Sequence, residues 1–194
     1  MKWLVLGAGA VCAALCIIAA VKAYRNAVTV STDCIDGGVR LYQSGEDAPK
    51  TVTSTEITEF YCEFSLYADA EPGALGNGRY RCHAVLQDGI VKCSIRWHDR
   101  MGVGEERAFD ADIAFMEQLH EIVSRYDLAK HNGYSYRVSG LPDMYGAELQ
   151  VVYASGESIY AINNQDVFLE YEALNDLFVL FSAWKKETVS NTEG

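Results

Sequence analysis

Four residues of the types that bind zinc lie close together in the sequence: Cys82, His83, Cys93 and His98. Residues 79–87 and 90–98 alternate apolar and polar side chains around Asp88-Gly89, a pattern that predicts a β-hairpin with a two-residue turn. Successive side chains of a strand point to opposite faces, so we expect both cysteines to face the core and both histidines to face solvent. Four ligands cannot converge from opposite faces. The sequence therefore predicts no zinc site, and we expect no metal or cofactor elsewhere in the chain.

The cysteines could instead form disulfides. Four of them follow the N-terminal segment, an even number that suits an oxidising compartment: Cys34, Cys62, Cys82 and Cys93. The two-residue turn would pair Ala84 with Cys93 and leave Cys82 one diagonal step away on the same face. Cys82–Cys93 is therefore the candidate disulfide. The alternative is that these cysteines are buried thiols that pack as small apolar side chains.

The common catalytic templates are incomplete in this chain. His120-Glu121 begins the helix pattern of zinc metalloproteases, but Ser124 occupies the position of the second histidine. No Gly-x-Ser-x-Gly nucleophile elbow occurs, and close acidic pairs are explained by helix caps and solvated loops. The sequence therefore predicts no catalytic residue. The alternative is a hydrolase that combines an acidic pair with His83 or His131.

Exposed aromatic residues near the Asn132-Gly133 turn offer a different kind of site. Tyr134, Tyr136 and Tyr145 are close in sequence, and aromatic clusters are typical of binding interfaces. We therefore predict a recognition surface at these three tyrosines.

Residues 3–21 form an unbroken run of apolar and small residues without a charge. The run is about as long as an α-helix that crosses the hydrocarbon core of a bilayer. We therefore expect a transmembrane anchor in residues 1–25, a stalk or linker in 26–50, a globular domain in 51–186 and a flexible tail in 187–194.

Other interpretations of this N-terminal run fit less well. A cleaved signal peptide would have a shorter apolar core, and residues 21–23 make a poor cleavage site. Val11 and Leu15 precede the two cysteines of the run, where a lipoprotein signal needs a small residue. Residues 5–12 resemble the glycine turn of a dinucleotide-binding domain, but Cys12 replaces the third glycine. An uncleaved anchor is the interpretation that we retain.

The charge of the chain bears on its partners. The formal net charge is −11, and the chain after residue 27 contains 13 basic and 27 acidic residues. Such a domain repels phosphate backbones, which argues against a nucleic-acid partner.

Hydrophobic periodicity predicts the remaining elements. Alternating residues in 51–67, 79–87 and 90–98 are typical of strands, and 134–139 is expected to form another. Residues 148–154 and 158–163 predict a hairpin across Ser155-Gly156 that is apolar on both faces, with Leu149, Val151 and Ile162 on one face and Val152, Ile159 and Ala161 on the other. Periods near 3.6 predict helices over 110–128 and 171–184, with Asp110 capping the first helix and Ile113 in its buried stripe. Residues 100–107 are expected to form an exposed loop, and residues 39–42 one short strand of the stalk. This order predicts an α+β domain, in which an antiparallel sheet carries both helices on one face.

One resemblance covers residues 116–184. The run consists of Asn132-Gly133, Leu141-Pro142-Asp143, Leu149-x-Val151-x-Tyr153-x-x-Gly156-x-x-Ile159-x-Ala161 and an aromatic helix. It resembles the C-terminal part of uncharacterised membrane-anchored or lipoprotein-type envelope proteins of Gram-positive anaerobes. That group often has a proline where this chain has residues 164–166. The resemblance implies an envelope location and no particular activity.

Together these patterns predict a single-pass membrane protein that binds a protein or an envelope component without catalysis. Lys2 before the anchor balances Lys22 and Arg25 after it, so the positive-inside rule hardly orients the chain. The cysteines after the anchor favour an extracytoplasmic domain. The alternatives are an envelope hydrolase and a domain that faces the cytosol.

Overall fold

The computed structural model describes residues 30–35, 38–43, 45, 47–66, 75–99, 101–140 and 146–184, and for residues 30–43 the backbone only. The predicted anchor at residues 3–21 and the predicted tail lie outside these ranges. No helix within the described part of the chain has the length and apolarity that a membrane crossing requires.

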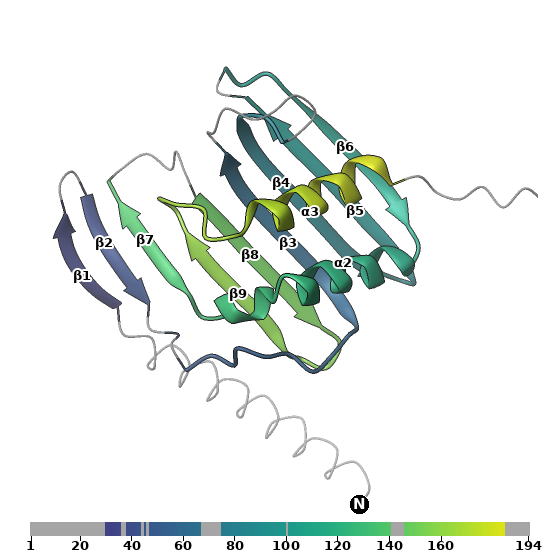
Figure 1. The fold of residues 1–194 in the computed structure, drawn as a ribbon, viewed down its shortest axis with the longest axis horizontal. Coiled ribbons are helices and arrows are strands. Elements are labelled where there is room, and N and C mark those ends of the chain that lie inside the picture. The colour runs from purple at the N-terminus through teal and green to yellow at the C-terminus, as the bar shows by residue number, and fades with distance from the viewer. Residues whose placement is uncertain are drawn as a thin grey trace, which may run out of the picture.

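The described residues form one large sheet and three helical segments (Figure 1). The strands are β1 (Val30–Ile35), β2 (Gly38–Gln43), β3 (Ile57–Leu66), β4 (Gly78–Gln87), β5 (Ile90–His98), β6 (Gly104–Ala111), β7 (Ser135–Ser139), β8 (Gly146–Tyr153) and β9 (Ser158–Asn163). The helical segments are α2 (Ala114–Arg125), the 3-10 helix η1 (Leu128–His131) and α3 (Tyr171–Ala183).

The sheet has the strand order β1-β2-β7-β9-β8-β3-β4-β5-β6, and α2 and α3 lie across one face of it (Figure 1). The domain is therefore α+β, with helices on one face as the sequence predicts. The expectation of a purely antiparallel sheet is wrong, because β7 and β9 are parallel. The hairpin of β8 and β9 inserts between β7 and β3, which makes β9, rather than β8, the neighbour of β7.

Two segments expected to be irregular belong to the sheet. Residues 30–35 and 38–43 of the predicted linker form the antiparallel strands β1 and β2, of which only a strand around residues 39–42 was expected. Residues 104–111 form β6, where the sequence analysis placed the end of a loop and the start of a helix. Edge strands are often short of apolar residues and rich in charges, so β6 lacks the pattern of an inner strand.

The start of α2 differs from the prediction as a consequence. Asp110 lies in β6, and the carboxylate that accepts a bond from the first turn belongs to Asp112, whose Oδ1 lies 3.1 Å from the amide nitrogen of Ala114. Ile113 precedes the helix and is 49% exposed, so it does not join the buried stripe. The buried residues of α2 are Phe115, Met116, Leu119, Ile122 and Val123.

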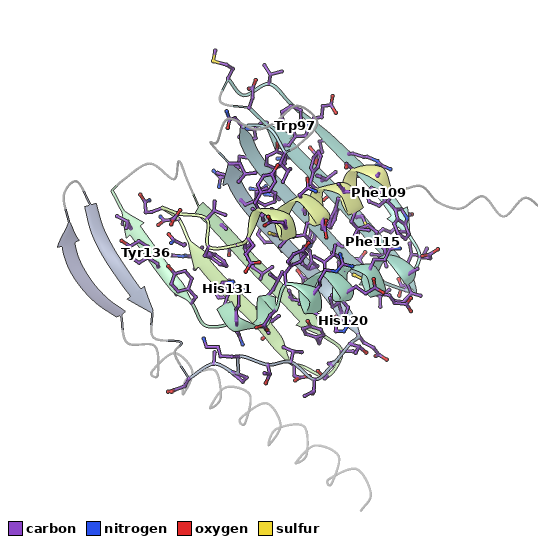
Figure 2. The ribbon with its side chains drawn as sticks, viewed as in Figure 1. Trp97, Phe109, Phe115, His120, His131 and Tyr136 are labelled. Atoms are coloured by element: carbon purple, nitrogen blue, oxygen red, sulfur yellow. The ribbon has the colours of Figure 1, made fainter. Side chains whose placement is uncertain are left out.

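The core lies between the helices and the sheet. Phe115 of α2 is fully buried, and three aromatic rings surround it with centroids 5.0 to 5.7 Å away: Phe109, Phe181 and Trp184. Figure 2 labels Phe109 and Phe115 beside the two helices. Alternate residues of the central strands complete this core, as their period of two predicts.

Arg107 of β6 caps the C-terminal end of α3. Its guanidinium donates to the carbonyl oxygens of Phe181, Ser182 and Trp184, and it lies 4.6 Å from the ring centroid of Phe109. The last carbonyls of a helix have no partner within the helix and carry partial negative charge, so a cation there is stabilising.

Replacing Arg107 with alanine should therefore lower the free energy of unfolding by about 1–2 kcal/mol. Arg107→Lys should recover only part of the loss, because lysine keeps the charge but loses the fork of donors. Thermal unfolding followed by circular dichroism measures both. Glu105→Ala, which changes an exposed residue of the same strand, is the control, and equal losses for Arg107→Ala and Glu105→Ala would contradict the capping role.

Candidate functional site

Both described helices cover the same face of the sheet, and the opposite face, here called the open face, carries most of the polar strand residues. The strand registers align its side chains in rows across the sheet. The central row contains Ile162, Glu148, Glu63, Arg81, Arg96 and Glu106, one residue from each strand from β9 to β6. The five charged members are here called the charge ladder.

Like charges are neighbours in the charge ladder. Glu63 lies opposite Glu148, and Arg81 lies opposite Arg96. In the next row, Arg79 lies opposite His98. Directly opposed like charges destabilise a sheet, because their side chains lie only about 5 Å apart at the Cβ atoms. Such pairs are therefore expected where counter-charges or a ligand compensate for the repulsion.

Glu63 is the main internal counter-charge. It is only 8% exposed, and its carboxylate accepts hydrogen bonds from Tyr61 Oη at 2.5 Å, from Arg81 Nε at 2.8 Å and from Arg79. Burial alone would raise the pKa of Glu63, but bonds from Arg81 and Tyr61 and the charges of both arginines outweigh burial and lower it. Burial and the neighbouring Glu63 carboxylate raise the pKa of Tyr61, which stays protonated as a donor.

A second hydrogen-bonded chain fixes the other end of the charge ladder. Tyr160 donates to Glu148 Oε1 at 3.2 Å and accepts a bond from Arg137 Nη2 at 2.9 Å. Burial, followed by the charge of Glu148, raises the pKa of Tyr160. The charged side chains of the open face are thus held in place by specific partners on neighbouring strands.

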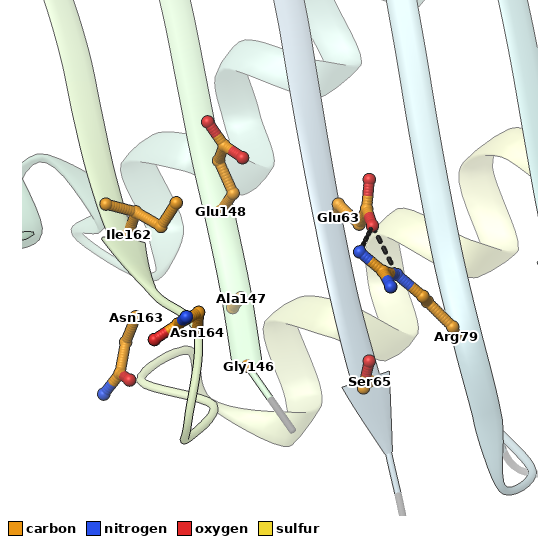
Figure 3. Close-up of a pocket in the computed structure, with 9 residues that line it drawn as sticks. All are labelled: Glu63, Ser65, Arg79, Gly146, Ala147, Glu148, Ile162, Asn163 and Asn164. Carbon is orange, nitrogen blue, oxygen red and sulfur yellow. Dashed lines mark hydrogen bonds and ion pairs between the residues drawn. The ribbon is translucent and has the colours of Figure 1, made fainter. Parts of the chain in front are cut away.

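Two hollows adjoin Glu63 and Arg79. Figure 3 shows the first, of about 90 Å³, where Arg79 contacts Glu63 while Glu148 stands on the adjacent strand. The second has a volume of about 180 Å³ and is lined by Glu63, Arg79, Tyr80, Arg81, Arg96 and His98. Its lining contains three guanidinium groups and one imidazole but a single carboxylate. We call it the cationic hollow.

No protein-family model, curated protein or solved structure matches this chain. Its function is therefore inferred from the arrangement of its own residues.

The predicted recognition surface lies apart from the charge ladder. Tyr134 is 40% exposed, its ring lies 5.5 Å from that of Phe168, and its hydroxyl accepts a bond from Asn163. Tyr136 lies in β7 next to Arg137, which contacts Tyr160 on the open face, so alternation places Tyr136 on the helix-bearing face (Figure 2). Tyr145 lies outside the described residues, and the recognition role of all three stays a prediction.

The cysteines of the core are free thiols in this structure: Cys62, Cys82 and Cys93. Cys93 lies opposite Ala84, as the two-residue turn predicts, and Cys82 lies opposite Cys62 of β3. The Cys82–Cys93 disulfide stays a prediction. Both cysteines point toward the helices, whereas His83 pairs with Glu59 on the open face at 3.6 Å.

Burial controls the reactivity of these three thiols. It raises the pKa of Cys93 to about 12 and also raises the pKa values of Cys62 and Cys82. If they are free thiols, as in this structure, all three should stay unmodified by iodoacetamide in the native protein and be alkylated in denaturant without a reductant. Peptide mapping by mass spectrometry reads each site separately. If Cys82 and Cys93 react only after reduction, the disulfide exists and the thiol assignment is wrong.

The two histidines suggested as alternatives for a hydrolase lie on opposite sides of the sheet. His131 of η1 lies on the helix-bearing side with its ring 5.1 Å from Phe168, and burial lowers its pKa. His83 lies on the open face with Glu59, and Ser94 is its cross-strand neighbour. The structure therefore brings His83 together with an acid but separates it from His131.

Ser94, His83 and Glu59 have the residue types of a nucleophilic triad but lack its geometry. Among the described residues, no hydrogen bond joins Ser94 to His83. An acyl-transfer site also needs free donors for an oxyanion, and the amides of inner strands such as β4 and β5 are used by the sheet. These three residues therefore do not have the geometry of a nucleophilic triad in this structure.

The cationic hollow was not predicted from the sequence, although part of its pattern is present there. The turn at Asp88-Gly89 sets the β4–β5 register, which places Arg81 opposite Arg96 and Arg79 opposite His98. The sequence could not place Glu63 beside these arginines, because the loop between β3 and β4 is too long to fix the register of the two strands.

Proposed function

We propose that this chain is a non-catalytic binding module. In this proposal residues 3–21 hold it in the cell membrane, and its α+β domain binds a protein or envelope ligand outside the cytoplasm. The observation that carries the proposal is the open face, a broad sheet surface with charged side chains fixed by hydrogen bonds, such as Glu63 to Arg81 and Tyr160 to Glu148. A flat polar surface with preordered charges favours specific recognition of a partner.

Site-specific photocrosslinking in intact cells tests the binding surface. A photoreactive residue at Ala108, which is exposed on the open face in the same row as His83 and Ser94, should form defined adducts. The same group at Gln118, which is exposed on α2, is the matched control and should form few or none. Equal adducts at both positions, or none at Ala108, would contradict the proposed surface.

The membrane location is tested separately. A reporter that is active only outside the cytoplasm, fused after Gly194, should be active and should sediment with membranes. Activity of a reporter restricted to the cytoplasm would favour a cytosol-facing domain on the same anchor.

An envelope hydrolase is the second candidate, and the proximity of His83 to Glu59 favours it. It predicts that His83→Ala abolishes a hydrolytic activity on ester, peptide or glycoside probes. Activity that is lost in His83→Ala but retained in His131→Ala would support catalysis, whereas wild-type protein without activity on all three probes would not.

A further inference from the structure

We propose that the cationic hollow binds a compact oxyanion, namely a carboxylate or phosphate group. The donors are Arg79, Arg81 and Arg96, with His98 beside them. This inference rests on the proposed binding function and names the chemistry that the open face recognises.

The arrangement of charge supports this site. Arg81 is directly opposite Arg96, a like-charged pair on β4 and β5, and Arg79 and His98 are opposite each other in the next row. Glu63 accepts hydrogen bonds from both Arg79 and Arg81, and Glu106 accepts them from Arg96 Nε at 3.1 Å and Nη2 at 2.7 Å. Three guanidinium groups are thus paired with two carboxylates. The next carboxylate of the charge ladder, Glu148, lies on the far side of Glu63 and lines the other hollow, so the lining of the cationic hollow itself keeps an excess of positive charge.

The three arginines also have more hydrogen-bond donors than their carboxylate partners can accept. Each guanidinium has five N–H donors in a planar fork, and two carboxylates cannot accept the donors of three such groups. The hollow of about 180 Å³ leaves space between them. Guanidinium forks bind planar carboxylates and phosphates through paired hydrogen bonds, which a single ammonium group cannot match.

The stability of the fold does not require Arg96. Its side chain is 50% exposed and that of its partner Glu106 is 55% exposed, so their ion pair contributes little to stability. Repulsion from Arg81 opposes even this contribution. An anion bound in the hollow would compensate for the repulsion between Arg81 and Arg96.

The net negative charge of the chain limits the size of the anion that the hollow can bind. The chain after residue 27 has 27 acidic and 13 basic residues, and its field repels extended polyanions. A compact anion contacts only the local positive charge and avoids most of this repulsion. The proposal therefore excludes nucleic acid as the occupant.

Calorimetric titration of the full-length chain in nanodiscs of zwitterionic lipid tests the site. The probes are inorganic phosphate and sodium acetate at matched ionic strength, and the tighter of the two identifies the oxyanion. Arg96→Gln should weaken binding of that probe at least about tenfold, because it removes one fork from the hollow. A single-stranded oligonucleotide should not compete.

Lys92→Gln is the matched control. Lys92 lies on the same strand and face, forms an ion pair with Asp110 at 2.8 Å and is 47% exposed, but it does not line the hollow. It should leave affinity within about twofold of wild type, and both variants should unfold near the wild-type temperature. Equal losses in both variants, or no binding of either probe by wild type, would overturn the site.

These outcomes separate this inference from the proposed function. Crosslinks from the open face without anion binding would leave the binding module standing and remove the oxyanion site. Anion binding that competes equally with an oligonucleotide would overturn the compact ligand.

Discussion

Replacing Glu63 with glutamine should lower the free energy of unfolding by about 2–3 kcal/mol. The carboxylate is 8% exposed and is the shared partner of Tyr61, Arg79 and Arg81. Glutamine occupies the same space but cannot neutralise two guanidinium groups. Arg79 and Arg81 are 41% and 47% exposed, so water compensates for part of the loss and keeps it below that of a fully buried pair.

The same group makes stability depend on acid. The pKa of Glu63 is lowered in the folded state, so the unfolded chain, with a carboxyl pKa of about 4.3, binds the proton more readily. The stability from Glu63 is therefore fully present above the unfolded pKa and is lost as pH falls through the folded pKa. Below about pH 4, wild type should lose more stability than Glu63→Gln.

Chemical denaturation at a series of pH values measures both effects. Glu106→Gln is the matched control, because Glu106 also faces an arginine of the same row but is 55% exposed, and its loss should stay below about 1 kcal/mol. Equal losses for the two variants, or parallel pH profiles for wild type and Glu63→Gln, would show that Glu63 has no special structural role.

Local sequence patterns predicted the strand register that depends on residues close together in the sequence. The β4–β5 hairpin has a two-residue turn, and its register follows from Asp88-Gly89. The β8–β9 register does not follow from a two-residue turn at Ser155-Gly156, because Leu149 pairs with Ala161 instead of Ile162. The like-charge pair of Arg81 and Arg96 follows from the first of these registers. The β3–β4 and β3–β8 registers, which bring Glu63 between Arg81 and Glu148, depend on long-range packing and are not encoded in a turn.

The face assignments of β8 and β9 illustrate the same limit. Ile162 was grouped with Leu149 and Val151, whereas the register places it opposite Glu148 on the open face. Ala161 and Ile159 instead face Leu149 and Val151 in the core. Both faces of these strands contain apolar residues, so alternation alone could not distinguish them.

The parallel contact of β7 and β9 is stabilised by an asparagine that propensity alone does not reveal. The side chain of Asn164 accepts a bond from the amide of Val138 and donates to its carbonyl oxygen, both at 2.8 Å. It thereby extends the hydrogen bonding between β7 and β9 by one residue beyond the end of β9.

Replacing Asn132 with alanine should destabilise the domain by about 3–4 kcal/mol. Asn132 is 7% exposed, and its amide joins two distant segments. Nδ2 donates to the carbonyl oxygens of Pro49 at 2.9 Å and Ser158 at 3.1 Å, and Oδ1 accepts from the amide of Tyr160 at 2.9 Å. Alanine would leave all three backbone groups without this partner in a partly buried position, where each unsatisfied group costs about 1–3 kcal/mol.

Asn132→Asp should be at least as destabilising, because a carboxylate would face two carbonyl oxygens that need a donor. Gln165→Ala is the control, since its side chain donates one bond to the carbonyl of Asn164 and its loss should stay below about 1 kcal/mol. Hydrogen exchange adds a local readout: the Tyr160 amide should lose protection in Asn132→Ala before β3 and β4 do. Unchanged protection at Tyr160 would mean that the Asn132 side chain does not stabilise this region.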